Sequence, residues 1–389
     1  MKRTIINIGV ILLILAGCVG CKQADTRIYD LITVDVTADY PEKDMVLQDF
    51  MDVEYVALET SDEFITQGVV KAIGKNILLV TNWNGNGDIL VFDRATGKGL
   101  RKINRFGQSG EEYSQVTFIT LDENNNEIFI MDYPARKICV YDLYGNFHRS
   151  FPFADTSYYH FITNYDKDHL IGYKGYSPTI ENEQSTHLLI SKQDGSITRE
   201  IQIPFKKIES PVVTKDGLVV TPSFCLIAPY NNEWVLTRTS SDTLYNYLPD
   251  GTIRPFIVRT PSIHSMDTEV FLFPTVLTDR YYFMHTMKKE VDFKTFKGFD
   301  GIDLVYDKQE NAIFEYSMYN DDFSDKEQIS LEQRPENPVN KEVITFETLN
   351  APDLVEAYNK NQLKGKLKEI AANLDEESNP VIMLLKPKI

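Results

Sequence analysis

A recurring pattern of apolar and polar positions organises this chain. Short runs of alternating apolar residues lead into an acidic or polar turn that ends in Gly or Asn, and the alternation then resumes. The clearest copies occupy 88–97 and 137–145, and weaker copies occupy 188–195, 243–251 and 302–311. Alternation with a period of two predicts half-buried β-strands. Gly and Asn tolerate the positive φ of a hairpin turn, so each copy predicts a β-hairpin.

The spacing of these copies predicts the architecture. Their turns fall roughly 50 to 60 residues apart, and a strand-built repeat of that length is typical of a β-propeller. Two long loops, at roughly 174–187 and 286–300, interrupt the regular spacing. The abundance of Tyr and Phe, with 21 and 22 residues, favours the same all-β fold. The second copy divides into a complete blade with strands at 118–122, 128–132, 138–142 and 147–153.

The C-terminal part of the chain leaves the strand pattern and then returns to it. Apolar residues within 353–374 follow helical spacing, and 381–386 is again a strand. We expect this strand to form a sixth blade with strands near 343–347 and 53–58. Combining both ends of the chain in one blade closes a propeller and removes its open edges. The sequence therefore predicts an all-β, six-bladed β-propeller of four-stranded blades over 41–389, with a short C-terminal helix before the closing strand.

The first residues form a secretory signal and not part of the fold. Lys2 and Arg3 make a short basic region, and the apolar run 5–16 that follows is too short to span a bilayer as a helix. The run leads into Leu-Ala-Gly-Cys, which resembles a bacterial lipobox and makes Cys18 the residue that carries the lipid after cleavage. Cys21 also follows a glycine and is the alternative lipidation site.

A lipidated N-terminus attaches a protein to a membrane. Two or three acyl chains hold a protein at a bilayer, whereas one chain binds only marginally. We therefore expect a signal peptide at 1–17 and a lipidated tether at 18–40. The residues Gln-Ala-Asp at 23–25 resemble the export signals of surface lipoproteins in Bacteroidetes-type bacteria. The sequence thus predicts an outer-membrane lipoprotein of the cell envelope, and this signal favours exposure at the cell surface.

Charge and cysteine content narrow the range of partners. The net charge is −17 at pH 7 and no large Lys/Arg cluster is present, so nucleic acid is not an expected partner. Cys139 and Cys225 lie inside predicted strands, where we expect small buried hydrophobic side chains. The six His residues are scattered, and no Cys or His spacing is typical of zinc. We therefore predict no metal, no cofactor and no catalytic residue.

Several segments resemble one family of propellers. They are the opening strand 53–60, the Gly-rich stretch 107–113, the repeat core at 127–132 and 138–142, and the later segments 242–245 and 379–382. In these segments the chain resembles the six-bladed β-propeller lipoproteins of Bacteroidetes, which are related to NHL-repeat propellers. Glu111 stands where the family usually has Gly, so the backbone there is expected to differ. The resemblance covers nearly the whole mature chain and implies the fold, but propellers host many activities, so it implies little about function.

One face of the predicted propeller gathers aromatic and basic residues. Loops between the second and third strands of each blade lie on the same face as the loops that join blades, and this face frames the mouth of the central channel. Aromatic rings stack on sugars or anchor partner proteins, and Arg can bind a carboxylate through two hydrogen bonds. The candidate ligand-binding residues on this face are Trp83, Arg105, Tyr113, Tyr133, Arg136, Tyr158, His160, Tyr176, Arg238 and His285.

These residues predict a binding or scaffold module for a glycan-like or anionic ligand, or for a partner protein of the envelope. A glycan-processing enzyme, either a lyase or a hydrolase with its site at the channel mouth, is the alternative function. A structural interpretation also exists, because Tyr and Arg side chains can simply pack between blades and extend along apolar surface.

Overall fold

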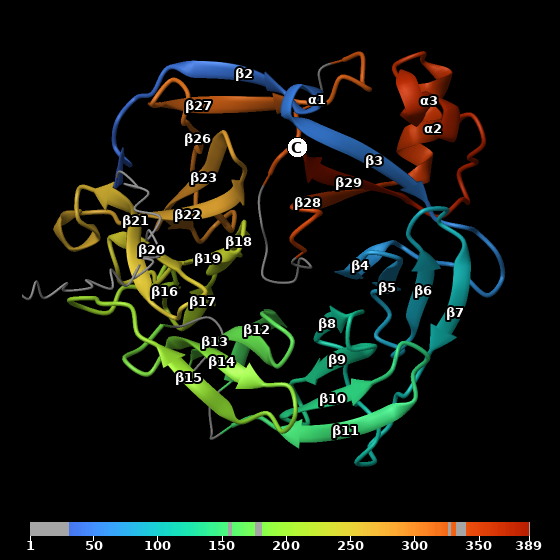
Figure 1. Ribbon diagram of the computed structural model, residues 1–389. Helices are drawn as coiled ribbons and strands as arrows, with labels where there is room; N and C mark the ends of the chain where they lie inside the picture. The colour runs from blue at the N-terminus through green and yellow to red at the C-terminus, as the bar shows by residue number, and fades with distance from the viewer. Residues whose placement is uncertain (1–30, 155–157, 176–180, 326–327, 332–339, 389) are drawn as a thin grey trace, which may run out of the picture. The chain divides into compact units, whose positions relative to one another are not determined.

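The predicted repeat copies form blades of a six-bladed β-propeller (Figure 1). The structure is a computed structural model that describes residues 31–154, 158–175, 181–325, 328–331 and 340–388. All of them belong to one unit that extends from Leu31 to Ile389. The candidate lipidation sites Cys18 and Cys21 lie outside the described residues, as does Tyr176.

Blades 1 to 3 are antiparallel sheets of four strands each, and consecutive strands are neighbours. Central strands such as β5 and β10 are buried almost throughout, because both of their faces pack against neighbouring blades. Blade 1 contains β4 (Val69–Ile73), β5 (Ile77–Thr81), β6 (Ile89–Asp93) and β7 (Gly99–Ile103); blade 2 contains β8 (Phe118–Asp122), β9 (Glu127–Asp132), β10 (Lys137–Tyr141) and β11 (Phe147–Pro152); blade 3 contains β12 (Tyr158–Asn164), β13 (His169–Gly175), β14 (Thr186–Ser191) and β15 (Ile197–Ile201).

Blades 4 and 5 each gain a fifth strand from the N-terminal segment. β1 (Ile32–Asp35) pairs in parallel with the outer strand of blade 4, and β2 (Glu42–Val46) pairs in parallel with the outer strand of blade 5. Blade 4 contains β18 (Ile227–Tyr230), β19 (Glu233–Leu236), β20 (Thr243–Tyr247) and β21 (Ile253–Thr260); blade 5 contains β22 (Val270–Leu277), β23 (Tyr281–Lys288), β26 (Asp303–Asp307) and β27 (Ala312–Tyr319).

The start of the fold differs from the boundary expected at residue 41. β1 lies within the segment 18–40 that the sequence assigns to the tether, and its side chains alternate between buried and exposed. Val34 is completely buried in the same apolar cluster as Ile257 of β21. A four-residue strand is too short to give a clear alternating pattern by itself, so only its pairing with β21 reveals it.

The sixth blade combines both ends of the described unit, as the sequence predicts. β28 (Thr345–Leu349) and β29 (Val381–Pro387) pair with β3 (Met51–Ala57) in one antiparallel sheet of three strands. Between β28 and β29 the predicted helical segment forms two short helices, α2 (Ala351–Asn359) and α3 (Gly365–Ala371). The backbone reverses between them at Asn361, which has a φ of 55°. A third short helix, α1 (Leu47–Phe50), leads from β2 into β3.

Apolar clusters fill the spaces between neighbouring blades. The cluster between blades 1 and 2, for example, joins Val91 of β6 to Ile128 of β9 and Cys139 of β10. Cys139 and Cys225 are both buried and free, which confirms the prediction that they act as small hydrophobic side chains. Two small hairpins are inserted into this framework, β16 (Val213–Lys215) with β17 (Leu218–Val220), and β24 (Val291–Asp292) with β25 (Lys297–Gly298).

Candidate functional site

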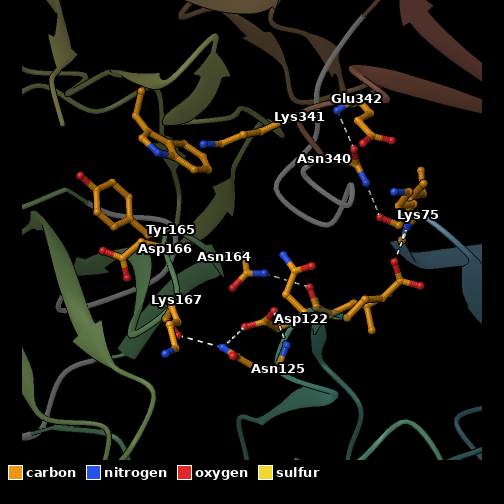
Figure 2. Close-up of a pocket in the computed structure, with 16 residues that line it drawn as sticks. Lys75, Asp122, Asn125, Asn164, Tyr165, Asp166, Lys167, Asn340, Lys341 and Glu342 are labelled. Carbon is orange, nitrogen blue, oxygen red and sulfur yellow. Dashed lines mark hydrogen bonds between the residues drawn. The ribbon is translucent and has the colours of Figure 1, made fainter.

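The turns between the first and second strands of neighbouring blades surround a cavity, which Figure 2 shows. They are the turn 74–76 of blade 1, the turn 123–126 of blade 2 and the turn 165–168 of blade 3. Trp234 of β19 and the segment 340–342 that precedes β28 complete the wall. The cavity has a volume of about 420 Å³, and we call it the inner-turn cavity.

The inner-turn cavity lies at the opposite end of the blades from the site that the sequence predicts. Successive turns of an antiparallel sheet alternate between the two ends of its strands. The cavity is lined by turns between first and second strands, which define the inner-turn end. The predicted site uses loops between second and third strands and loops between blades, which define the outer-loop end.

A buried ion pair holds the turns of blades 2 and 3 together. The ammonium group of Lys192 lies 2.5 Å from a carboxylate oxygen of Asp122, and both side chains are almost completely buried. Lys192 also donates a hydrogen bond to the backbone carbonyl of Asp166, at 2.6 Å. Asn125 donates from Nδ2 to Asp122, at 2.8 Å, and to the carbonyl of Lys167, at 2.8 Å. The two turns are therefore fixed to each other before any ligand binds.

The other wall is held in a similar way. Asn340 donates a hydrogen bond to the carbonyl of Ile73, at 2.6 Å, and its Oδ1 accepts one from the N–H of Glu342, at 2.7 Å. The carboxylate of Glu123 accepts hydrogen bonds from the backbone N–H groups of Lys75 and Asn76. These contacts join blade 1 to the turn of blade 2 and to the segment that enters blade 6.

The acidic side chains around the cavity are all engaged within the protein. Asp122 and Glu123 make the contacts given above, and Glu342 lies 3.9 Å from Arg94. Asp166 accepts hydrogen bonds from the N–H of Asp168 and from His169. Burial opposes the charge of Asp166, but these hydrogen bonds outweigh it and lower the pKa of the carboxyl group.

The lysines at the cavity, in contrast, form no ion pair with the residues that the structure describes. Lys75 and Lys167 are exposed, and neither ammonium group has an ion-pair or hydrogen-bond partner among the residues that the structure describes. The ammonium group of Lys341 lies 5.8 Å from the centre of the Trp234 ring. The cavity therefore presents ammonium groups without an ion-pair partner among the described residues, whereas its carboxylates stay charged but already accept hydrogen bonds or lie near Arg94.

Two aromatic rings and a polar oxygen complete the wall. The rings of Tyr165 and Trp234 lie 6.2 Å apart, with 35° between their planes. Burial, together with the nearby Tyr247 and Asp166, raises the pKa of Tyr165 to about 12, so its hydroxyl stays protonated at neutral pH. Asn164 donates from Nδ2 to the Leu121 carbonyl, at 3.2 Å. Its Oδ1 is buried and has no partner within the described residues, so it can accept a hydrogen bond from a ligand.

This arrangement is suited to binding. It offers cations for an anionic group, the partly exposed Tyr165 ring for an apolar one and, within the described residues, an unpaired Asn164 Oδ1 for a hydroxyl group. Within the described ranges, no group of three or more His, Cys, Asp or Glu side chains is placed to hold a metal ion. The described residues also contain no helix that is long and apolar enough to cross a membrane.

Some of the sequence-predicted site residues gather at the outer-loop end around blades 2 and 3. The guanidinium of Arg136 lies 4.5 Å from the centre of the Tyr158 ring, and the Tyr133 ring lies 5.8 Å from the same ring. Trp83 is 79% exposed, and Arg105 is exposed but donates to the carbonyl of Gly145, at 2.8 Å.

Two further predicted residues are buried in the interior of the fold. Tyr113 is completely buried and donates to the carbonyl of Gly87, at 2.7 Å, and burial raises its pKa to about 12. Arg238 is 2% exposed and lies 2.5 Å from a carboxylate oxygen of Glu181. Burial raises the pKa of Glu181 to about 7 although the charge of Arg238 opposes this. Both predicted residues therefore hold the fold together.

The two predicted histidines lie beside an aromatic stack at the outer-loop end. The His160 ring stacks on Phe224 at 6.0 Å, and Phe224 stacks on Phe273 at 5.1 Å. Burial lowers the pKa of His160 to about 4, so its imidazole is neutral at pH 7. His285 lies 2.8 Å from Asp303, and the space between it and the stack has a volume of only about 10 Å³.

Sequence reasoning missed the residues of the inner-turn cavity, which are Lys75, Asn164, Tyr165, Lys167, Trp234 and Lys341. A signal was present, because a polar turn follows the first strand in each of blades 1 to 3. Such turns also occur in hairpins without any function, so composition alone did not distinguish them. The segment 340–342 could be placed only by its contact with Ile73.

Comparison with known proteins identifies the fold family. The family model described as a domain of unknown function, DUF4934, matches residues 31–386. No curated protein matches the chain.

Solved structures share the fold at low sequence identity. A protein from Bacteroides fragilis described as exported is 16% identical, with a TM-score of 0.60, and the match covers 92% of this chain and 100% of that one. A DUF4221 member from Bacteroides vulgatus is 10% identical, with a TM-score of 0.47 over 88% of this chain and 99% of that one. Virginiamycin B lyase from Staphylococcus aureus is 13% identical, with a TM-score of 0.39 over 86% and 99%. The first structure supports the propeller fold; likeness at these identities says nothing about shared activity.

Proposed function

Since the chain belongs to the DUF4934 family of domains of unknown function, its role has to follow from its own geometry, and we propose that the inner-turn cavity binds an anionic saccharide. The observation that carries this proposal is the contrast between engaged acids and unpaired lysines. A ligand that bears a carboxylate or sulfate group gives Lys75 and Lys167 the partner that the described residues do not supply.

The rest of the wall suits a sugar better than a simple inorganic anion. The unpaired Oδ1 of Asn164 can accept a hydrogen bond from a ring hydroxyl. Tyr165, which is partly exposed, provides ring surface for the C–H face of a sugar, and the buried Trp234 ring lies beside it. The volume of about 420 Å³ lies within the range that is usual for small-ligand sites.

We further propose that this binding module is an outer-membrane lipoprotein, with lipid on Cys18 or, in the alternative, on Cys21. The support is the apolar run 5–16 followed by Leu-Ala-Gly-Cys. Incorporation of labelled palmitate into the full-length chain tests this proposal. We expect Cys18→Ala to abolish labelling. Loss of labelling only in Cys21→Ala assigns the lipid to Cys21. Absence of labelling in the unsubstituted chain rejects lipidation.

Isothermal titration with uronic-acid oligosaccharides, beside neutral oligosaccharides of the same length, tests the ligand proposal. The double variant Lys75→Met/Lys167→Met should weaken binding of the acidic oligosaccharides about tenfold, because each ion pair contributes roughly 0.5 to 1 kcal/mol. Lys360→Met/Lys366→Met is the matched control, since it removes the same charge from exposed positions, one directly after α2 and one on α3. Equal loss in both variants, or equally tight binding of the neutral oligosaccharides, would reject the proposed site.

A further inference from the structure

Two inserted hairpins meet at the outer-loop end of the blades. β16 and β17 lie in the connection from blade 3 to blade 4, and β24 and β25 lie between the second and third strands of blade 5. They come into contact where the ammonium group of Lys215 lies 5.8 Å from the centre of the Phe293 ring. Neither hairpin belongs to the blade framework, since each forms a separate two-stranded sheet. We call the two together the hairpin pair.

The hairpin pair exposes apolar side chains that the core does not use. Leu218 and Val219 are 49% and 55% exposed, and Phe296 is 61% exposed. Phe296 lies in a tight turn that is fixed by Asp292, whose carboxylate accepts a hydrogen bond from the N–H of Lys294 at 2.8 Å. The turns hold the backbone of both tips, so these apolar side chains stay exposed to water. They are therefore free to enter an apolar phase.

The two hairpins carry three lysines, Lys215, Lys294 and Lys297, against two acids, Asp216 and Asp292, so they are slightly positive on a strongly acidic protein. Lys294 and Lys297 flank Phe296, and neither has an ion-pair partner within the described part of the chain. Lys215 precedes the turn that leads to Leu218. Asp292 is engaged in its own turn. Exposed Phe and Leu beside Lys is the composition that binds at the interface of anionic membranes.

The chain before the fold can bring this surface to a bilayer. Leu31 precedes β1 on blade 4, which is the blade that the β16–β17 connection enters. The chain makes thirteen residue-to-residue steps from Cys18 to Leu31, which span at most about 45 Å. A lipid on Cys18 therefore keeps blade 4 close to the membrane and raises the effective concentration of the hairpin pair at its surface.

From these observations we propose that the hairpin pair binds an anionic phospholipid surface, an inference that rests on the lipid anchor proposed above. Phe296, Leu218 and Val219 enter the headgroup region, and Lys215, Lys294 and Lys297 contact the lipid phosphates. The outer-loop end then faces the membrane. Because the inner-turn cavity lies at the other end of the blades, it faces away from the bilayer and stays open to soluble ligand.

Sedimentation with vesicles separates this proposal from the anchor itself. The chain from Lys22 onward lacks both lipidation sites but retains every strand of the six blades, all of which lie between Ile32 and Pro387. We expect it to bind vesicles of phosphatidylcholine with phosphatidylglycerol and not vesicles of phosphatidylcholine alone. Leu218→Ser/Phe296→Ser should weaken this binding about tenfold, and Lys294→Glu/Lys297→Glu should abolish it.

Tyr144→Ala is the control, because Tyr144 is also highly exposed but lies between the third and fourth strands of blade 2, at the inner-turn end, and the variant should bind vesicles as the unsubstituted chain does. Unchanged binding in both hairpin variants overturns the proposal, as does equal binding to neutral vesicles. Capture of a partner protein by the hairpin pair without any vesicle binding overturns it too. Palmitate labelling reports on the anchor independently, so failure of one proposal is distinguishable from failure of the other.

Discussion

The two ends of the blades differ in what fills the space at the innermost strands. At the outer-loop end, His160, Phe224 and Phe273 form a stack, and the gap beside it measures only about 10 Å³. At the inner-turn end, polar turns enclose about 420 Å³, and the lysines at the rim have no ion-pair partner among the described residues. Within the described residues, the stack at the outer-loop end is packed like a protein interior, whereas the fixed turns at the inner-turn end leave a cavity open.

The difference shows how burial decides the role of a polar residue. Histidine, tyrosine and arginine at the outer-loop end look like ligand-binding groups in the sequence, but most of them are enclosed by aromatic rings or ion pairs there. Lysine and asparagine at the inner-turn end look like ordinary turn residues, but they line an open cavity. A side chain can bind a ligand only where the fold has not already used its polar atoms.

The largest expected effect comes from breaking the buried ion pair beneath the inner-turn cavity. Lys192→Met leaves the carboxylate of Asp122 buried without its counter-ion, so the free energy of unfolding should fall by about 3 to 5 kcal/mol. Urea unfolding measures this loss. Lys366→Met removes a lysine from an exposed pair with Glu369 and should cost less than about 1 kcal/mol. Similar losses in both variants would show that Lys192 does not hold the turns.

The second largest effect concerns the outer-loop end and its dependence on pH. Burial lowers the pKa of His160 from 6.5 to about 4. Between these values the unfolded chain binds a proton at His160 that the folded chain does not, so the free energy of unfolding falls as the pH falls. The full shift corresponds to roughly 3 kcal/mol below pH 4.

Urea unfolding as a function of pH, in the unsubstituted chain and in His160→Phe, measures how much His160 contributes to the pH dependence of the free energy of unfolding. Burial lowers the pKa of His187 as well, to about 3, so the substitution should reduce the slope between pH 6.5 and 4 and not remove it. His169→Phe is the control, because the His169 side chain is partly exposed beside Asp166 at the other end of the blades. A slope that His160→Phe leaves intact would contradict the buried neutral imidazole.

Much of the fold could be predicted from the sequence, whereas the end of the blades at which the cavity lies could not. The pattern of five hairpins depends on local alternation and on turns at Gly97, Gly145, Gly195 and Gly251, which all have a positive φ in the structure. The sixth blade followed from the need to close an edge. Which end of the blades stays open depends on side chains from separate blades, such as Phe224 and Phe273, that meet only after folding.

A smaller effect separates the contribution of charge from that of hydrogen bonding to ligand affinity at the inner-turn cavity. Asn164→Ala removes the unpaired Oδ1, and affinity for an acidic oligosaccharide should fall about fivefold, for one neutral hydrogen bond. Because this atom carries no charge, the dependence of affinity on salt should stay unchanged. Lys75→Met should instead make the affinity less sensitive to salt. Titrations at two salt concentrations measure both quantities, and the same salt response in the two variants would contradict this division.

The smallest effect is expected at the outer-loop end, where the sequence predicts the site. Trp83 is 79% exposed, and its side chain contributes to none of the apolar core clusters among the described residues. Trp83→Ala should therefore change the free energy of unfolding by no more than about 0.5 kcal/mol. It should also leave oligosaccharide affinity unchanged, since the ligand binds at the other end of the blades. Loss of affinity in Trp83→Ala, with Lys75→Met unaffected, would transfer the ligand site to the outer-loop end, because an exposed indole contributes to affinity only where the ligand covers it.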